Sequence, residues 1–209
     1  FRRTASAGGW PSWTSLPEMA LYYDLHIHSC LSPCADDDMT PGSILRMARL
    51  KGLDVVAVTD HQSAGNLPAA WHFAQREGVL LVPALEITTM EEVHVLAYFP
   101  ELDSALEMGA WCGQHLPALE NRPALFGNQL LADSSDNVTT AESRLLMAAL
   151  NRTLHQVAAK TRALGGAVVP AHINRGSNGI LTALGFVPTE EGFTALEAAP
   201  CLPLPGTFD

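Results

Sequence analysis

The segment from residue 21 to residue 29 reads LYYDLHIHS and combines an apolar strand pattern with two histidines, His26 and His28. Side chains two residues apart in a β-strand project from the same face of the sheet. Both imidazoles can therefore approach one cation together, and imidazole pairs of this kind suit zinc, iron and manganese. The segment predicts a strand that carries part of a metal site at its carboxyl end.

After the segment 21–29, short apolar runs alternate with amphipathic stretches, which is typical of parallel strands joined by crossover helices. The pattern predicts strands over 21–28, 54–59, 79–87, 93–99, 167–173 and 193–198. It predicts helices over 40–51, 67–77 and 141–164. The first helix has Thr40 as N-cap, Pro41 at its first position and Gly52 at its end. A barrel-like α/β domain is favoured over a sandwich, with an open doubly wound sheet as the alternative.

Two parts of the chain depart from this alternation. Residues 1–18 show no period of strand or helix, and we interpret them as a flexible or extraneous leader before a natural start at Met19. Residues 100–140 contain several prolines and a polar run, which indicates a short helix and an irregular insertion. The remaining segment, 19–209, is expected to form one domain.

Composition excludes several classes of protein. The chain has 209 residues, 47% of them hydrophobic and 16% charged, so it can bury a core. It has no run of about 18 apolar residues, which argues against a membrane span. A net charge of -10 argues against a broad basic surface for nucleic acid, but not against a small anionic substrate, because divalent cations can reverse the field inside a pocket. The four cysteines lack paired spacing, which favours a reducing, cytoplasmic setting.

Further histidines and one glutamate follow the predicted strands. His61 closes the second strand, Glu86 closes the third, His94 lies early in the fourth and His172 ends the strand over 167–173. In a parallel α/β barrel the carboxyl ends of the strands meet at one rim, where active sites lie. We therefore expect a metal site at this rim, and its candidate ligands are His26, His28, His61, Glu86, His94 and His172.

The order of these motifs resembles the PHP family, the polymerase and histidinol phosphatase domain. The motifs are 25–29 (LHIHS), 59–61 (TDH), 85–87 (LEI), 93–96 (VHVL) and 170–172 (PAH). The resemblance implies a distorted seven-stranded (β/α) barrel with one to three divalent metal ions, zinc, manganese or iron. It also implies phosphoester hydrolysis by a metal-activated water.

The resemblance further implies which residues share each ion. His26, His28 and Glu86 would hold one metal, and Glu86 would bridge to a second metal held with His94 and His172. His61 would belong to a third metal, together with a ligand from the loop 30–38. Catalytic roles would fall to Glu86 and His61. Arg175, three residues after His172, is a candidate for binding a phosphate oxygen, with a solvated loop charge as the alternative.

Two positions depart from the family pattern. Where relatives place Asp or His in the loop after His28, this chain has Pro33 and Cys34. Asp36 is the first candidate to replace that ligand, ahead of its neighbours 37 and 38, and the Cys34 thiolate is the alternative. The family's closing Asp-x-His motif does not follow Glu197, so the resemblance implies a barrel incomplete at its carboxyl end. The site built from Glu86, His94 and His172 is then expected to show the highest metal occupancy.

The remaining polar residues receive supporting or structural roles. Asp24 and Asp60 are candidates for orienting imidazoles through the second ring nitrogen. His72, His115 and His155 are expected to be surface or packing residues.

The main functional hypothesis is a phosphoesterase acting on a small phosphorylated substrate, a nucleotide or a short oligonucleotide. The alternatives are a noncatalytic PHP-like metal-binding module and a metal-dependent hydrolase of amides or carboxylic esters.

Overall fold

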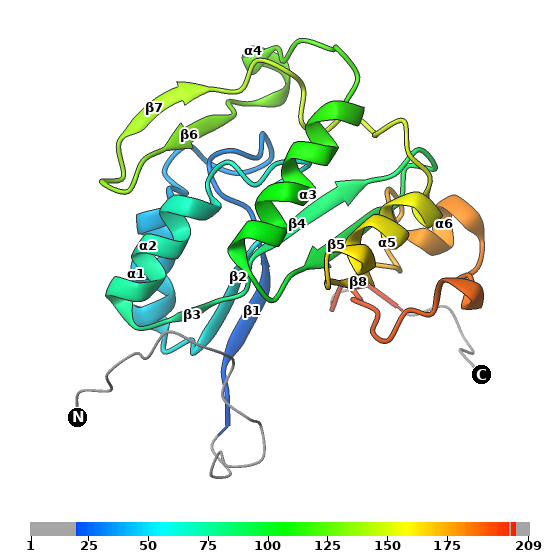
Figure 1. Cartoon of the computed structure of the whole chain (residues 1–209), viewed down its shortest axis with the longest axis horizontal. Helices are drawn as coiled ribbons and strands as arrows, with labels where there is room; N and C mark the ends of the chain where they lie inside the picture. Colours follow the sequence, from blue (N-terminus) through cyan, green and yellow to red (C-terminus); the bar gives the residue numbers. More distant parts are fainter. Residues whose placement is uncertain (1–19, 201, 204–209) are drawn as a thin grey trace.

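The computed structural model describes residues 20–200 and 202–203, so the predicted leader and Met19 lie outside the described residues (Figure 1). The elements occur in this order: β1 (Tyr23–Ile27), α1 (Pro41–Lys51), β2 (Val55–Val58), α2 (Leu67–Glu77), β3 (Leu80–Leu81), β4 (Ala84–Thr88), β5 (His94–Tyr98), α3 (Leu102–His115), α4 (Pro123–Phe126), β6 (Leu130–Ala132), β7 (Val138–Ala141), α5 (Leu154–Ala163), β8 (Ala167–Pro170) and α6 (Ile180–Leu184). A 3-10 turn, Thr189–Glu191, follows α6.

The strands form two three-stranded sheets and a hairpin. β1, β2 and β3 are parallel, as predicted. The expectation of parallel strands is wrong for the second sheet, in which β5 runs antiparallel to both β4 and β8. The turn between β4 and β5 is closed by a hydrogen bond from Thr89 N to Val93 O, and a connection this short cannot cross over between parallel strands.

A bridge between His61 and Glu86 joins the end of β2 to β4, and so connects the two sheets. The mixed α/β class is therefore confirmed. The distorted seven-stranded barrel, expected to be incomplete at its carboxyl end, stays a prediction, because only this isolated bridge joins the two sheets among the described residues.

The predicted strand over 79–87 is divided at Pro83. Val82 N still donates to Val56 O in the first sheet, whereas Pro83 O accepts from Phe99 N in the second. Proline has no N–H to continue a ladder, so the chain changes sheets there. This change of sheet moves Glu86 from the end of a strand in the first sheet to the middle of β4.

The first two helices begin and end where the sequence predicts. The Thr40 side chain accepts a hydrogen bond from Ser43 N, and Pro41 occupies the first turn of α1. Gly52 and Gly78 end α1 and α2 with φ of 74° and 71°, a left-handed conformation that glycine adopts without strain.

The second half of the chain differs from the prediction. The short helix expected after residue 100 is α3, with 14 residues, and the helix expected over 141–164 is only α5, with 10 residues. A capping box at Thr153 starts α5, while Leu146 and Leu150 are buried from a loop, so their helical spacing was misleading. Residues 193–198 form no strand, although Glu197 N donates to Pro170 O beside β8.

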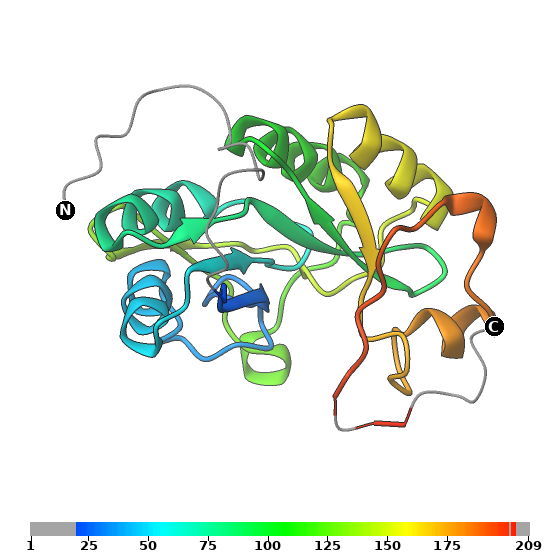
Figure 2. The same ribbon diagram turned by 90° about the horizontal axis from the view of Figure 1, so that it is seen from below.

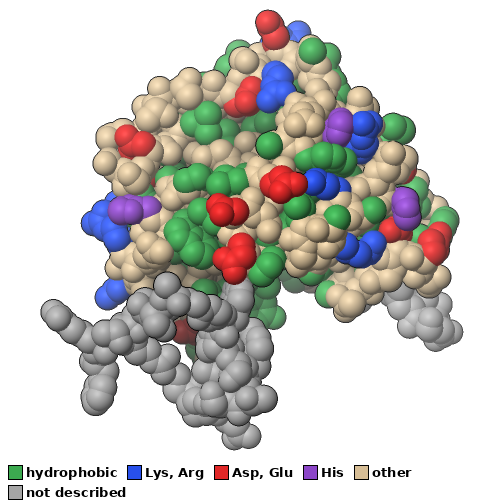
Figure 3. Space-filling model, viewed as in Figure 1, with side chains coloured by type: hydrophobic (Ala, Val, Ile, Leu, Met, Phe, Trp, Pro, Cys, Tyr) green, Lys and Arg blue, Asp and Glu red, His purple; other side chains and the backbone are tan. Residues whose placement is uncertain are grey.

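Figures 1 and 2 place α3 and α5 on the same face of the β4–β5–β8 sheet, with α1 and α2 side by side next to the first sheet. A continuous core of apolar side chains fills the space between these layers, and it includes Val58, Phe73, Leu85, Met108 and Val157. On the face shown in Figure 3, acidic and basic side chains are scattered and form no continuous basic patch. Among the described residues, every helix is too short or too polar to cross a membrane.

Candidate metal centre

Five imidazoles surround the carboxylate of Glu86, whose side chain is 1% exposed. The distances from ring nitrogen to carboxylate oxygen are 3.4 Å for His26, 3.1 Å for His28, 3.3 Å for His61, 2.9 Å for His94 and 3.1 Å for His172. The structure thus brings together all six residues that the sequence places at the rim. The ligand expected from the loop after His28 is not one of these six. The six residues come from segments separated by as many as 146 positions, His26 to His172 (172 minus 26).

The sheet topology explains why these side chains meet. His28 directly follows β1, which ends at Ile27. His61 and His172 lie a few residues beyond the ends of β2 and β8, at Val58 and Pro170. His94 begins β5 instead of ending it, but β5 is antiparallel to β4, so its first residue lies opposite Thr88 at the carboxyl end of β4. The rim therefore contains residues that follow β1, β2 and β8 and the first residue of β5, which runs in the opposite direction.

The two oxygens of Glu86 face different groups of histidines. Oε1 lies near His26, His94 and His172, whereas Oε2 lies near His28 and His61. A carboxylate shared in this way can bridge two cations. Burial alone would raise the pKa of Glu86, but hydrogen bonds from His172, His26, His28 and His94 outweigh it and hold the pKa well below its usual range.

The tautomer of His28 is fixed by a hydrogen-bonded chain that starts at Asp60. The Ser32 hydroxyl donates to Asp60 Oδ1 at 2.7 Å and lies 3.1 Å from His28 Nδ1. A hydroxyl has one hydrogen to donate, so Ser32 accepts from Nδ1–H of His28. Asp60, expected to orient an imidazole directly, thus orients one through Ser32.

Glu197 orients His26 in the same way. Its Oε1 lies 2.8 Å from His26 Nδ1, and its Oε2 accepts from His172 N at 2.8 Å. Sequence reasoning missed this role. The sequence places Glu197 near the end of a weak strand pattern, which hints at a position beside the sheet. Only the contact of Glu197 with β8 shows that its side chain reaches His26.

These tautomers test whether the cluster fits a metal. With Nδ1 donating to Ser32 or Glu197, the Nε2 atoms of His28 and His26 face the anionic Glu86 from 3.1 and 3.4 Å, and they donate to it only when the rings are protonated. Two acceptors this close require a proton or a metal ion between them. Ligands about 2.1 Å from a tetrahedral zinc ion are about 3.4 Å apart, which matches this spacing.

Buried nitrogen atoms without hydrogen-bond partners support the same conclusion. His61 Nδ1 and His172 Nδ1 are both buried and unpartnered. Buried polar atoms are almost always paired, so the orphaned Nδ1 of His61, which lies 3.3 Å from Glu86 Oε2, suits a missing ligand bond. The residues present therefore fit divalent cations.

The donor sets overlap with those implied by the family resemblance. His26, His28 and Glu86 form one group of donor atoms within 4.8 Å of one another, as expected. His61, with Glu86 and His94, forms another such group, so His61 lies nearer the central carboxylate than expected. His172 joins through Glu86 Oε1.

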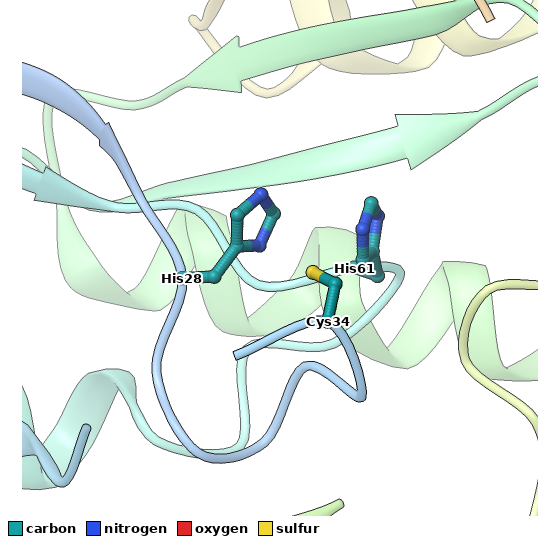
Figure 4. A group of neighbouring side chains, drawn as sticks. All are labelled: His28, Cys34 and His61. Carbon is teal, nitrogen blue, oxygen red and sulfur yellow. The ribbon is translucent and has the colours of Figure 1, made fainter. Parts of the chain in front are cut away.

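The loop after β1 directs a thiol, and not a carboxylate, at the cluster (Figure 4). Cys34 Sγ lies within 4.8 Å of donor atoms of His28 and His61. Asp36, the first candidate from the sequence, lines a separate pocket together with its two acidic neighbours and Asn128, which donates to Asp37. The structure therefore places Asp36 away from the metal donors, and the geometry favours the Cys34 alternative.

The cluster forms the floor of a cavity of about 410 Å³. Arg175 is exposed on its wall and is the only arginine or lysine among the described lining residues. Its position three residues after His172 follows from a tight turn, in which Arg175 N donates to His172 O at 2.9 Å. Asp24 also lines the cavity, and its Oδ1 accepts from His26 N.

The other histidines lie outside this cavity. His72 is exposed, His115 packs its ring edge against Trp111 with centroids 4.6 Å apart, and His155 contacts Glu191. All three occupy the surface or packing positions expected for them.

Comparison with known proteins finds partial sequence relatives. A phosphoribosyl 1,2-cyclic phosphate 1,2-diphosphodiesterase from Eggerthella lenta is 32% identical over 98 residues, which cover 44% of this chain and 36% of that protein. The 5'-3' exoribonuclease Rnm from Salmonella typhimurium is 35% identical over 77 residues, covering 36% of this chain and 25% of that protein. The chain thus matches less than two fifths of the length of either curated relative. No protein-family model matches the sequence.

Solved structures share the fold. A protein assigned as a metal-dependent phosphoesterase from Bifidobacterium adolescentis aligns with a TM-score of 0.58 and 22% identity, covering 87% of this chain and 80% of that one. The lesion-specific endonuclease Q from Pyrococcus furiosus aligns with a TM-score of 0.61 and 22% identity, covering 85% of this chain and 42% of that one.

Proposed function

We propose that this chain, a PHP-type protein by its motifs and fold, is a metal-dependent phosphoesterase that hydrolyses a small phosphate ester or nucleotide. The observation that carries the proposal is the convergence of five imidazoles on the buried Glu86 at the floor of a cavity that also holds Arg175. The distorted barrel of the family, expected to be incomplete at its carboxyl end, is part of this proposal.

Different residues of the chain would bind the metal ions and orient the metal ligands in such a reaction. When bound, divalent cations lower the pKa of a coordinated water and withdraw charge from phosphoryl oxygens. Glu86 and the five histidines would hold those cations, and Glu197 and Ser32 keep the Nε2 atoms of His26 and His28 facing Glu86. The chemistry needs no nucleophilic serine or cysteine.

Cavity size and charge favour a small anionic substrate. A volume of about 410 Å³ lies in the range of small-molecule sites. The net charge of -10 disfavours long nucleic acids, whereas the 5'-3' exoribonuclease among the similar proteins favours a nucleotide or an oligonucleotide end. We propose a phosphomonoester or a terminal phosphodiester as the scissile group.

The test is hydrolysis of a chromogenic phosphate ester by the chelator-treated protein with manganese or zinc added back. We expect turnover only with metal, and little hydrolysis of the corresponding acyl ester. Preferential acyl-ester cleavage would support the amide or ester hydrolase instead. Bound metal without turnover of phosphomonoesters, phosphodiesters or acyl esters would support a noncatalytic module.

Arg175→Ala is expected to raise KM for the phosphate ester about 10- to 100-fold. The estimate follows from charge-assisted hydrogen bonds, which contribute about 1.5 to 3 kcal/mol. Steady-state kinetics measure the change, and Arg175→Lys should recover part of it.

Arg122→Ala is the matched control, because Arg122 is exposed outside the cavity. An unchanged KM in Arg175→Ala would show that Arg175 is a solvated loop charge.

A further inference from the structure

We infer that Cys34 is a metal ligand and that it forms, with His28 and His61, a thiolate site that prefers zinc to manganese. The inference deepens the proposed function, since it names the ligand and the metal preference of one position in the same cluster. It does not depend on the reaction catalysed, because it can be tested with metal alone.

The three donors come from separate parts of the chain. Cys34 lies on the loop between β1 and α1, His28 follows β1, and His61 follows β2. Figure 4 shows the three side chains around a common space. Their donor atoms, Sγ and one ring nitrogen each, lie within 4.8 Å of one another.

His61 provides an independent indication that a ligand belongs there. The residue is 3% exposed, and its Nδ1 atom is buried without a hydrogen-bond partner. A neutral imidazole nitrogen in that position lacks the partner that burial normally requires. A cation held with Cys34 would satisfy it.

The spacing suits a tetrahedral ion after a small adjustment. Zinc–sulfur and zinc–nitrogen bonds of about 2.3 and 2.1 Å place the two donors about 3.6 Å apart. The observed upper limit of 4.8 Å therefore requires a shift of about 1 Å at most. Cys34 is exposed on a loop, so its side chain is the one that can move.

Glu86 lies beside two of the three donors. Its Oε2 lies 3.1 Å from His28 Nε2 and 3.3 Å from His61 Nδ1, on the side of the carboxylate that faces away from the other three histidines. One thiolate sulfur and two imidazole nitrogens are donors typical of tetrahedral zinc. Manganese prefers oxygen-rich sites, so a thiolate at this position biases the site against it.

The acidic residues of the same loop do not compete for this role. Asp36, Asp37 and Asp38 line a different pocket. Among the described residues of the loop, only Cys34 joins a group of candidate donors. The thiol is therefore the loop's contribution to the cluster.

The experiment reconstitutes the chelator-treated full chain with cobalt(II), which adopts zinc geometries and has visible spectra. A thiolate ligand gives an intense near-ultraviolet sulfur-to-cobalt charge-transfer band. We expect the wild type to show this band, and Cys34→Ser to lose it together with on the order of 100-fold in zinc affinity at one site. Manganese affinity should change less than about threefold.

Two further variants make the result decisive. Cys34→Asp should bind cobalt without the band and narrow the preference for zinc over manganese, because it replaces sulfur by oxygen. Cys201→Ser removes a thiol outside the described residues and should leave the band intact. A band that persists in Cys34→Ser, or disappears in Cys201→Ser, overturns the inference. Circular dichroism verifies that each variant is folded.

Discussion

Glu86→Gln is expected to lower kcat/KM for phosphoester hydrolysis about a thousandfold, which corresponds to about 4 kcal/mol of transition-state stabilisation. The substitution keeps the shape of the side chain but removes the charge on which five imidazoles converge. Both oxygens face potential cations, so metals on the two sides should be weakened together. Elemental analysis should show lower metal content in the same preparation that loses activity.

The control for Glu86→Gln is Glu120→Gln, since Glu120 is an exposed carboxylate outside the cavity. It should retain wild-type kinetics and metal content. Near-native hydrolysis by Glu86→Gln would contradict the bridging role. A loss of activity with full metal content would instead assign Glu86 to the reaction and not to metal binding.

The family resemblance and the rim of the site were predictable because their signals are local. A His-x-His pair at a strand end, or a TDH tripeptide after a strand, fixes both the residue type and its position in the fold. Both ends of α1 were predictable for the same reason. Thr40 and Gly52 each act within one helical turn of the end that they cap. Solved structures at 22% identity show that the fold is shared.

Features that depend on distant contacts were not predictable. Glu197 meets His26 across 171 positions, and no spacing in the sequence indicates that partner. The burial of Leu146 and Leu150 from a loop imitates the period of a helix. In the loop after His28, composition favoured Asp36, whereas the path of the backbone directs Cys34 inward.

The metal-free protein is expected to be most stable near pH 6.5. Burial alone would lower the pKa of His26, but hydrogen bonds to Glu197 and Glu86 raise it from 6.5 to about 10. The resulting stabilisation is complete below pH 6.5 and is lost as the pH rises through about 10. Burial lowers the pKa of His61 to about 3, so between pH 6.5 and 3 the unfolded chain binds a proton that the folded chain does not. Stability therefore falls in both directions.

Saturating zinc should move this maximum to higher pH, because the ion replaces the proton between His26 and Glu86. At 100 times its dissociation constant, a ligand adds about 2.7 kcal/mol, or about 5 to 10 °C in Tm for a chain of this size. Thermal unfolding with and without zinc, from about pH 5 to pH 9, measures both effects.

Glu197→Gln removes one hydrogen bond that raises the pKa of His26. The stability of the metal-free variant should therefore decline less steeply above pH 6.5. If the Tm of the metal-free protein keeps rising above pH 6.5, no proton is held at His26. If the increase in Tm caused by zinc becomes smaller as the pH rises, proton and metal do not compete for the site.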